Sequence, residues 1–439
     1  MAIVFVLVAL LVLAVVVTAN WYVWRRLFRD TTRGPGLTRR AGAVLIAGGW
    51  VLAITALVAE RSGAPFWLQQ TLAWPGFLWL ALSMYLLLAV LAGELVRPLL
   101  ARFLQRRDRA RAAAPEAEAA AAQSEPVAVP GGAAVAAAAD RRQPAPGGPS
   151  EPPADPDAAP AAPAGPSRRL FVSRVVAGTA AAAAVGTVGY GTYGVLRGPR
   201  VKRVTVPLAK LPRAAHGYRI AVVSDVHLGP VLGRGFAQKV VDTVNATQPD
   251  LIAVVGDLVD GSVKDLGPAA APLAQLRARH GSYFVTGNHE YFSGAEQWVE
   301  EVRRLGLIPL ENARREMPHF DLAGVNDVAG EDEGQGPDFA KALGDRDTAR
   351  ACVLLAHQPV QIHDAVEYGV DLQLSGHTHG GQLWPGNLLA SGANPTLAGL
   401  ERYGDTQLYV SRGAGAWGPP TRVGAPSDIT VIQLASKQA

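Results

Sequence analysis

Residues 374–382 read Leu-Ser-Gly-His-Thr-His-Gly-Gly-Gln, and the fold follows from what this stretch requires of the rest of the chain. His377 and His379 are one residue apart, glycines flank the pair, and the apolar run 370–374 leads directly into it. The pattern predicts a strand that ends in a loop. Because glycine lets the backbone bend sharply and approach a ligand closely, both imidazoles can be aimed into one pocket. Paired histidines favour a transition metal; the alternative is two surface histidines on a flexible loop.

Four earlier apolar runs also end in polar residues. The runs are 218–223, 251–255, 283–286 and 351–356, and the polar residues behind them are Asp225 and His227, Asp257 and Asp260, Asn288 and His289, and His357. Helical spacing follows the first two runs, at 234–245 and 269–279. This alternation predicts an α/β domain with a largely parallel inner sheet, whose sites form outside the carboxyl ends of the strands.

Seven of these side chains are oxygen and nitrogen ligands placed at five strand ends. They are Asp225, His227, Asp257, Asn288, His357, His377 and His379. Any one of them alone could be a helix cap or a satisfied polar group. Their placement at one edge of a single sheet favours a shared role instead. A two-metal site needs about this many ligands, with one carboxylate shared between ions about 3.5 to 4 Å apart.

The ordered set Asp225-x-His227, Gly256-Asp257, Gly287-Asn288-His289-Glu290, His357 and Gly376-His377-Thr378-His379 resembles the calcineurin-like metallophosphoesterases. The resemblance covers residues 216–436 and implies a two-sheet β-sandwich flanked by helices. It implies a ligand set as well: Asp225, His227 and His379 on one metal, Asn288, His357 and His377 on the other, and Asp257 bridging them. It further implies that His289 faces the substrate phosphate as a catalytic group and that Asp260 orients His289.

The implied chemistry is hydrolysis of a phosphoester by a hydroxide that two transition-metal ions, manganese, iron or zinc, make available near neutral pH. Protein phosphatases of this superfamily carry an arginine directly after the carboxylate equivalent to Asp260. Gly261 and Ser262 stand there in this chain, which argues against a protein substrate. Leu383, Trp384, Leu388 and Leu389 form an apolar loop after the opening stretch, and we interpret it either as ordinary packing or as a contact for an acyl chain or the bilayer.

Composition indicates that part of the chain lies in a membrane. Mean hydropathy is +0.14 and 49% of the 439 residues are hydrophobic. Arginine and lysine outnumber acidic residues before residue 200, and the reverse holds after it. The half with the candidate site therefore lacks the basic balance that a nucleic-acid partner would need. The single cysteine, Cys352, excludes an internal disulfide framework.

Residues 1–111 are expected to form a transmembrane region with about three spanning helices, at 2–19, 41–59 and 72–96. A cleavable signal peptide and a buried soluble hairpin are the alternatives. Six arginines lie between the first two spans and another six lie after the third, whereas the second connection carries only Arg61. By the positive-inside rule, the first and third connections face the cytoplasm and the N-terminus lies outside.

Residues 112–166 are rich in Ala, Pro and Gly and predict a disordered linker. Residues 167–200 begin Ser167-Arg168-Arg169-Leu170-Phe171-Val172 and continue into a mild apolar stretch, which resembles a twin-arginine export signal or is a fourth span. Both interpretations place residues 201–439 outside the cytoplasm, with the export machinery as a partner in the first. Arg197, Arg200, Lys202 and Arg203 lie on the side that the charge rule disfavours.

The sequence therefore predicts a multi-pass cell-membrane protein whose extracytoplasmic domain is a dinuclear metal-dependent phosphoesterase. Its expected substrate is a phosphodiester or pyrophosphate of a lipid-linked or cell-envelope molecule. The alternatives are a phosphomonoesterase, or a non-catalytic membrane protein that uses the domain as a binding module.

Overall fold

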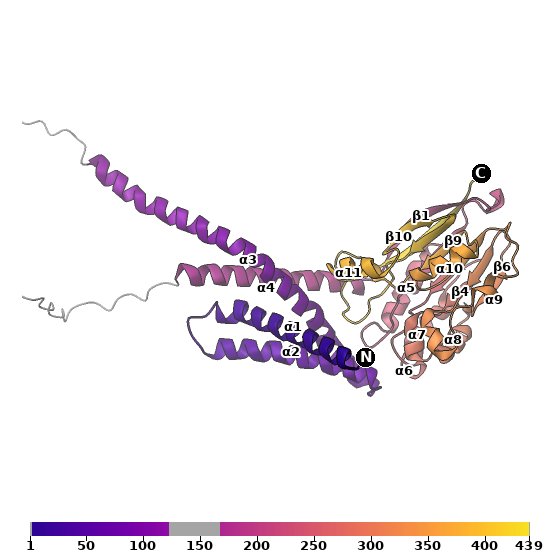
Figure 1. Ribbon diagram of the computed structural model, residues 1–439, viewed down its shortest axis with the longest axis horizontal. Helices are drawn as coiled ribbons and strands as arrows, with labels where there is room; N and C mark the ends of the chain where they lie inside the picture. The colour runs from indigo at the N-terminus through magenta and orange to yellow at the C-terminus, as the bar shows by residue number, and fades with distance from the viewer. Residues whose placement is uncertain (1, 123–166, 439) are drawn as a thin grey trace, which may run out of the picture.

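The computed structural model describes residues 2–122 and 167–438 and divides into a helical part and a mixed α/β part (Figure 1). Four long helices make up the first part: α1 (Ala2–Trp24), α2 (Leu37–Arg61), α3 (Phe66–Ala122) and α4 (Arg168–Leu196). A π-helical turn, Arg25–Arg29, follows α1. By length and composition all four are apolar enough to cross a membrane, the described windows being Val6–Arg29, Leu37–Arg61, Phe66–Ala110 and Arg168–Leu196.

The helical part is held together by close packing around α3, which contacts both α2 and α4. Gly49 of α2 lies against the indole of Trp79, so closely that a Cβ at residue 49 would overlap the ring. Trp50 donates a hydrogen bond to Asn20 of α1 (2.8 Å), and Tyr85 and Val188 lie in the same buried cluster. The three predicted spans thus pack as one bundle with the fourth helix beside it.

The predicted linker, residues 112–166, lies mostly outside the described residues. Helix α3 continues to Ala122, so the first residues of that segment are helical. Residues 123–166 are not among those that the structure describes.

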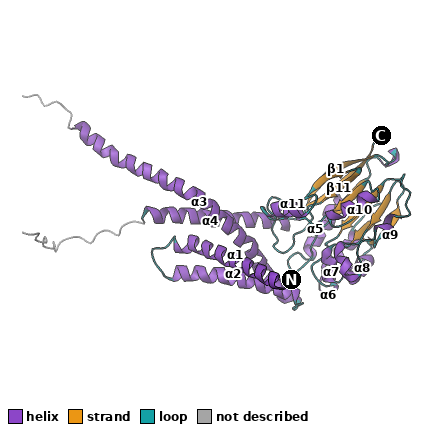
Figure 2. Cartoon of the chain, viewed as in Figure 1, coloured by secondary structure: helices purple, strands orange, loops and turns teal. Residues whose placement is uncertain are grey.

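The second part is a sandwich of two six-stranded sheets with helices on its outer faces, as the resemblance implies (Figure 2). The first sheet has the order β1-β12-β2-β3-β4-β5 and the second β10-β11-β9-β8-β7-β6. Strands β2 to β5 are parallel, as are β7, β8, β9 and β11, whereas β12, β10 and β6 each add an antiparallel pairing. The prediction of an α/β domain with a largely parallel inner sheet is confirmed.

The strands have the following bounds: β1 Arg200–Leu208, β2 Arg219–Val223, β3 Leu251–Val255, β4 Ser282–Val285, β5 Ile308–Pro309, β6 Ala313–Glu316, β7 Asp321–Gly324, β8 Cys352–Leu355, β9 Leu372–Ser375, β10 Gly399–Tyr403, β11 Thr406–Val410 and β12 Asp428–Ser436. The helices have these: α5 Arg234–Ala246, α6 Val263–Ala270, α7 Asn288–Ser293, α8 Ala295–Arg304, α9 Phe339–Leu343, α10 Ile362–Glu367 and α11 Gly386–Ala393.

One predicted helix is misplaced. The sequence predicts a helix at 269–279, but α6 occupies Val263–Ala270 and only a 3-10 turn continues to Gln275. Ser262 explains the earlier start, because its side chain accepts a hydrogen bond from the backbone N–H of Asp265 and caps the helix.

Three buried layers position the site. The inner layer lies between the sheets and includes Ile220, Leu251, Leu372 and Tyr409. The first outer layer packs α5, α6 and α8 on the first sheet, and the second packs α9 and α10 on the other. Since both sheets are anchored by apolar side chains, the strand ends that carry the polar residues are fixed relative to one another.

The sandwich is joined directly to the long apolar helices. Val195 near the end of α4 is fully buried in the core of the α/β domain, and only three residues separate that helix from β1. The hydroxyl of Tyr85 on α3 donates a hydrogen bond to the carbonyl of Trp384 (2.8 Å), and Thr192 on α4 bonds Thr421 (2.7 Å). The two parts therefore pack as one body.

Candidate metal centre

The predicted ligands lie at strand ends and share an uncommon backbone conformation. Five of them have positive φ angles: Asp225 (52°), His227 (47°), Asp257 (53°), His377 (73°) and His379 (52°). A residue with a Cβ is rarely found there, and such conformations persist only where the surrounding structure enforces them, most often at functional sites. Among the described residues, five of the eight non-glycine residues with positive φ are thus predicted ligands.

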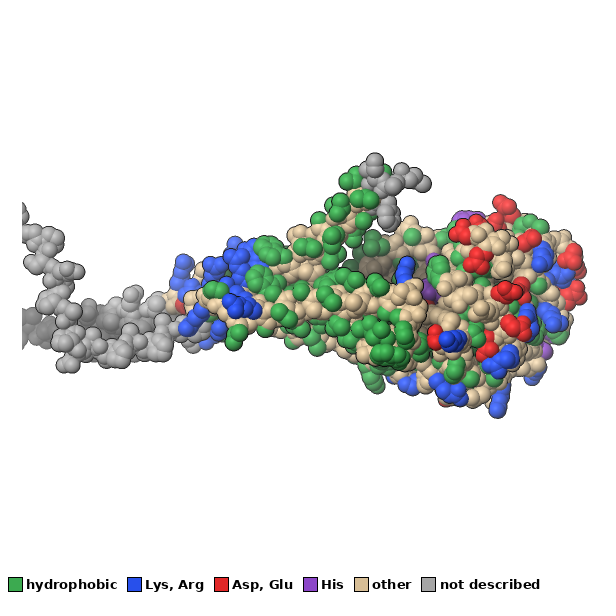
Figure 3. Space-filling view, turned by 90° about the horizontal axis from the view of Figure 1, so that it is seen from below, with side chains coloured by type: hydrophobic (Ala, Val, Ile, Leu, Met, Phe, Trp, Pro, Cys, Tyr) green, Lys and Arg blue, Asp and Glu red, His purple; other side chains and the backbone are tan. Residues whose placement is uncertain are grey.

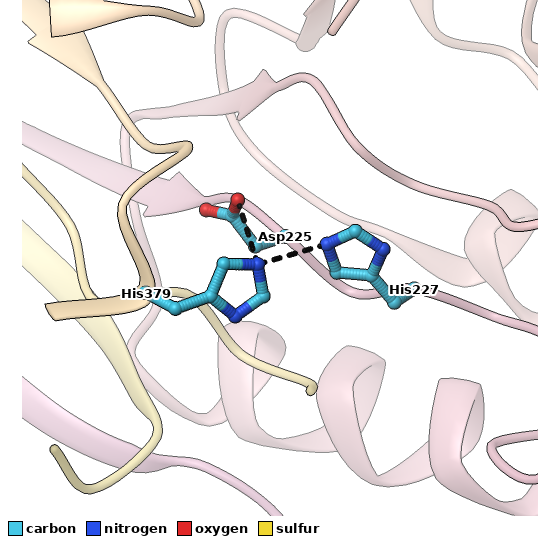
Figure 4. A group of neighbouring side chains, drawn as sticks. All are labelled: Asp225, His227 and His379. Atoms are coloured by element: carbon cyan, nitrogen blue, oxygen red, sulfur yellow. Dashed lines mark hydrogen bonds and ion pairs between the residues drawn. The ribbon is translucent and has the colours of Figure 1, made fainter. Parts of the chain in front are cut away.

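Asp225, His227 and His379 form the first group of candidate ligands (Figure 4). Their side chains come from the ends of β2 and β9 and point toward one another. The Nε2 atoms of His227 and His379 are 3.0 Å apart, and Oδ1 of Asp225 is 3.4 Å from Nε2 of His379. All three residues are buried. One cation could contact a ligand atom of each.

Asp257, His357 and His377 form the second group, with ligand atoms within 4.8 Å of one another. Oδ2 of Asp257 is 3.1 Å from Nε2 of His357, and Oδ1 of Asn288 is 3.0 Å from Nδ1 of His377. The same Oδ2 of Asp257 is 3.7 Å from Nε2 of His227 in the first group. Asp257 therefore lies between the two groups.

The hydrogen bonding of His357 shows that the second group suits a cation. Its Nδ1 is 2.9 Å from the carbonyl oxygen of Val255 and must carry the proton that donates to it. Nε2 then holds a lone pair, is buried, and has no hydrogen-bond partner among the described residues. It faces the Asp257 carboxylate, which can only accept when ionised. A cation between Nε2 of His357 and the Asp257 carboxylate would accept electron density from both.

The pKa shifts in the site follow from burial and from these carboxylates. Burial lowers the pKa of His377 to about 4, with the neighbouring His357 adding to the effect, so His377 is a neutral imidazole with a free lone pair at neutral pH. Burial would lower the pKa of His357 too, but Asp257 beside it raises that pKa well above the usual value, so that without a cation a proton on Nε2 takes the place between these two atoms that a cation would otherwise fill. Burial opposes ionisation of Asp257, yet His357 and His227 hold its pKa below the usual range.

His289 and Asp260 lie beside the two groups. Oδ1 of Asp260 is 2.8 Å from Nδ1 of His227 and 2.7 Å from Nδ1 of His289, so one carboxylate holds both rings. Burial would lower the pKa of His289, but the bond to Asp260 raises it to about 9. The His289 side chain is 15% exposed, whereas that of His227 is fully buried. His289 is thus a protonated, solvent-reachable group at the edge of the cluster.

All nine predicted site residues are brought together, but the motifs assign no role to Glu290 or to Arg422. The buried Glu290 carboxylate accepts hydrogen bonds from the backbone N–H groups of Asp257 (2.9 Å), Leu258 (2.7 Å) and Gly287 (2.6 Å). It therefore fixes the turn that carries Asp257. Glu290 stands in the motif Gly-Asn-His-Glu, so its position was signalled even though its function was not.

Arg422 lies behind His379. Its guanidinium is 3.0 Å from Nδ1 of His379 and donates hydrogen bonds to the carbonyls of His379, Gly415 and Ala425. Burial lowers the pKa of Arg422 to about 10. Nothing local in the sequence distinguishes this arginine, because its partners lie in other segments.

Two glycines are required by close approach. A Cβ on Gly376 would overlap Ser224 and Asp225, and one on Gly287 would overlap Asp257. The glycines of the sequence motifs therefore let neighbouring strand ends come together around the ligands.

A cavity at this edge extends to the membrane helices. It is lined by His227 and Asp260 on the domain side and by Glu60 of α2 and Phe77 of α3 on the other. Val231, in the loop after β2, packs against Phe77 and belongs to the same wall. The candidate site thus opens toward the end of the helical bundle, a placement that the sequence does not predict.

Comparison with known proteins agrees with this geometry. The family described as Calcineurin-like phosphoesterase matches residues 218–381. A Danio rerio protein named "Transmembrane protein with metallophosphoesterase domain" is 40% identical over 264 residues, which are 57% of this chain and 60% of that protein. The chain thus matches only about three-fifths of that relative's length.

Two bacterial proteins named "Uncharacterized metallophosphoesterase" are similar over a comparable share of the chain. The one from Helicobacter pylori is 38% identical over 250 residues, 56% of this chain and 67% of that protein. The one from Aquifex aeolicus is 35% identical over 243 residues, 54% of this chain and 92% of that protein. Because the match to the Aquifex protein extends over nearly its whole length, and the matched residues carry the ligand cluster, the chain belongs to the calcineurin-like metallophosphoesterases.

Proposed function

We propose that this protein is a membrane-anchored, dinuclear metal-dependent phosphoesterase that hydrolyses a phosphodiester or pyrophosphate of a lipid-linked or cell-envelope substrate. The observation that carries the proposal is the position of Asp257. Its Oδ2 atom is 3.1 Å from Nε2 of His357 and 3.7 Å from Nε2 of His227, so one carboxylate serves both groups of ligands. A shared carboxylate is the feature that a two-metal site needs.

In this proposal Asp225, His227 and His379 hold one ion, and Asn288, His357 and His377 hold the other. When bound, manganese, iron or zinc ions would make a water molecule acidic enough to supply hydroxide near neutral pH and would offset charge on the phosphoryl oxygens. Side chains of the protein position the ligands of these ions. Glu290 holds the backbone of Asp257 in place, and Arg422 holds the backbone of His379 through its carbonyl oxygen.

His289 supplies the proton that the leaving oxygen needs. Its Nδ1 bonds Asp260, so its Nε2 is the atom that faces away from that carboxylate and can donate. The raised pKa of about 9 keeps this imidazole protonated at neutral pH. The ring lies between Phe292 and Trp417, whose ring centroids are each 5.6 Å from its own. These contacts restrict His289 to an orientation that Asp260 also favours.

The charge distribution supports an extracytoplasmic domain. Figure 3 shows lysine and arginine side chains gathered at the end of the bundle away from the domain, with hydrophobic side chains along the helices between. Contacts place the two basic connections at that one end, because Arg26 pairs with Glu94 (2.8 Å) and Arg174 donates to the carbonyl of Thr31 (3.0 Å). By the positive-inside rule this end is cytoplasmic, so the domain and the N-terminus lie on the other side.

Helix α4 is proposed to remain as an anchor after any passage through the twin-arginine machinery. Gly191 approaches the backbone of Arg422 so closely that a Cβ would meet its carbonyl oxygen at 2.7 Å, and Val195 is buried in the domain core. A cleaved segment would not be integrated into the domain in this way.

Exposed apolar side chains near the site support a lipid-linked substrate. Trp384, Leu388 and Leu389, on α11 and just before it, are 54%, 66% and 83% exposed, and the carbonyl of Trp384 is bonded to Tyr85 of the membrane helix α3. These apolar side chains thus lie at the junction between domain and bundle. An exposed apolar patch beside a membrane helix suits contact with an acyl chain or the bilayer.

The full chain, purified in detergent and loaded in turn with manganese, iron and zinc, would test the proposal on a substrate panel. We expect hydrolysis of bis(p-nitrophenyl) phosphate and of a lipid-linked diester that chelation abolishes. Turnover confined to monoesters would favour the phosphomonoesterase alternative. Metal binding without turnover of any phosphoester would favour the binding module.

A further inference from the structure

Glu60, on a membrane helix, is placed where a substrate would meet it. It lies one residue before the end of α2 and lines the cavity that also reaches His227 and Asp260. The charges of Asp260 and His289 lie close enough to act on its carboxyl group. A residue of the helical part therefore shares a cavity with the catalytic part of the domain.

The chain gives this carboxylate no direct hydrogen-bond or ion-pair partner, and only the longer-range charges of His289, Arg61 and His227 attract it. Within residues 2–122 and 167–438, no hydrogen bond or ion pair is made by the Glu60 side chain, and no lysine or arginine lines the cavity. Arg61 follows it in sequence but is exposed to solvent. A half-buried carboxylate without a partner costs free energy that a bound cationic group would recover.

The position is unfavourable for a carboxylate in a second way. The last turn of a helix is its negative end, where a cation is stabilised and an anion is not. Glu60 therefore stabilises neither its own helix nor the contact between helix and domain. Glu60 thus lacks a bonding partner and lies at a helix end that disfavours an anion. A carboxylate in such a position, in a cavity beside a candidate site, is suited to binding a ligand.

The rest of the cavity indicates what kind of ligand fits. Phe77 of the bundle and Val231 of the domain supply an apolar wall, and His227 and Asp260 lead to the candidate ligands. The cavity is small, about 10 Å³, so a phosphate held near His289 would bring only the end of its ester substituent to Glu60. An additional negative charge there would be repelled, whereas a positive charge would be attracted.

Resting on the proposed phosphoesterase function, we propose that Glu60 is a specificity residue that binds an ammonium group on the alcohol of a phosphodiester substrate. The substrate class is then a zwitterionic phosphodiester such as an ethanolamine headgroup, and pyrophosphates and dianionic monoesters are disfavoured. Hydrolysis adds one water across a P–O bond, and the leaving oxygen takes its proton from His289. Glu60 takes no part in that step.

The test compares the full-length metal-loaded wild type with Glu60→Gln, which removes the charge but keeps the shape. The substrates are dihexanoyl phosphatidylethanolamine and dihexanoyl phosphatidylmethanol, which share their acyl chains and differ in the ammonium group. We expect Glu60→Gln to lower kcat/KM at least about tenfold on the first, the order of a lost bond between charged groups, and to leave the second within about twofold. An equal change on both, or on neither, would overturn the proposal.

Three controls sharpen the comparison. Glu60→Asp keeps the charge. Compared with Glu60→Gln it should restore part of the preference for the ethanolamine substrate, which a purely structural role of the side chain would not explain. Glu401→Gln makes the same chemical change on the exposed strand β10 and should alter neither substrate. Soluble glycerophosphoethanolamine tests the headgroup without acyl chains: a Glu60-dependent preference that survives there assigns recognition to the ammonium group itself, and its loss would overturn that assignment.

A binding measurement separates this proposal from the function on which it rests. Calorimetric titration with 2-aminoethylphosphonate and ethylphosphonate compares two ligands that cannot be hydrolysed and that differ by the ammonium group. The wild type should bind the aminated ligand more tightly, and Glu60→Gln should bind both equally. If no phosphodiester is hydrolysed but this difference is found, the enzymatic proposal fails and the recognition by Glu60 stands. If phosphodiesters are hydrolysed without this difference, the enzymatic proposal stands and the recognition by Glu60 fails.

Discussion

At the scale of single residues, the sequence motifs predict which side chains gather but not what holds them. Asp225, His227 and Asp257 are recognisable because aspartate and histidine follow apolar runs at fixed short spacing. Glu290 accepts a hydrogen bond from the backbone of Asp257, and Arg422 donates one to the backbone carbonyl of His379, both through contacts between distant segments. The spacing of residues along the chain carries no information on such contacts. The roles of Glu290 and Arg422 can therefore be recognised only in the three-dimensional structure.

Asp257→Asn should remove bound metal and abolish hydrolysis. The carboxylate lies between both groups of ligands, so an amide in its place weakens both positions. Elemental analysis of the purified variant, together with turnover of bis(p-nitrophenyl) phosphate, measures the two effects. Asp242→Asn, on the exposed face of α5, is the matched control and should retain both. Full metal content with full activity in Asp257→Asn would contradict the shared-ligand assignment.

His289→Ala should keep its metal but slow turnover by roughly 10² to 10⁴, the range for loss of a general acid. The ring bonds Asp260 and lies at the edge of the cluster, so its removal leaves the candidate ligands in place. Single-turnover rates and metal content of the variant would be compared with those of His363→Ala, an exposed histidine on α10. An undiminished rate would end the assignment of His289.

Cys352 should resist alkylation in the folded protein. Burial raises the pKa of its thiol to about 12, so at pH 8 the group stays protonated, and the thiolate is the reactive form. Mass spectrometry after iodoacetamide treatment should find no adduct in the native chain and one adduct after unfolding. Rapid labelling of the folded protein at pH 8 would show that β8 is not packed as described.

At the scale of elements, strands were easier to predict than helices. Each apolar run that ends in polar residues is a strand, because a buried strand needs a short apolar run and the site needs polar residues at its end. The helix predicted at 269–279 is wrong because its start depends on the cap at Ser262 rather than on the apolar spacing that follows. Capping is a local bond, and here it overrides periodicity.

The double change Trp384→Ser, Leu388→Ser should reduce activity on lipid-linked diesters and preserve it on a small chromogenic diester. Both side chains are largely exposed, so their loss should leave the folded domain intact while removing the apolar surface beside the membrane helices. Relative kcat/KM on the two substrates is the measurement. Val360→Ser, Val366→Ser alters two exposed valines elsewhere and is the control. Equal losses on both substrates would argue against a lipid contact.

At the scale of the whole molecule, the sequence predicts the parts but not their arrangement. Hydropathy identifies the helices that are long and apolar enough to span a membrane, because length and composition suffice for that. The sequence does not predict that Glu60 and Phe77 form one side of the cavity beside His227. That placement depends on α2, α3 and the domain meeting in space, through contacts such as the bond from Tyr85 to the carbonyl of Trp384.

The proposed topology, with the domain outside the cytoplasm, predicts different labelling of two introduced cysteines. Asp405→Cys lies in the hairpin between β10 and β11, and Thr38→Cys lies at the opposite end of the bundle, near the start of α2; both positions are exposed. A membrane-impermeant maleimide should label the first in intact cells and the second only after permeabilisation. The buried Cys352 provides an internal blank in the unsubstituted chain. The reverse pattern would place the domain in the cytoplasm.

Three residues separate α4 from β1, and the last turn of that helix is embedded in the domain core. A domain fastened in this manner cannot swing out on a tether to search the surrounding fluid. For a substrate anchored in the same bilayer, enzyme and substrate instead meet by lateral diffusion in two dimensions. The rate of encounter then scales with the number of substrate molecules per unit area of membrane, so diluting the suspension would leave it unchanged, whereas diluting the substrate with inert lipid would slow it.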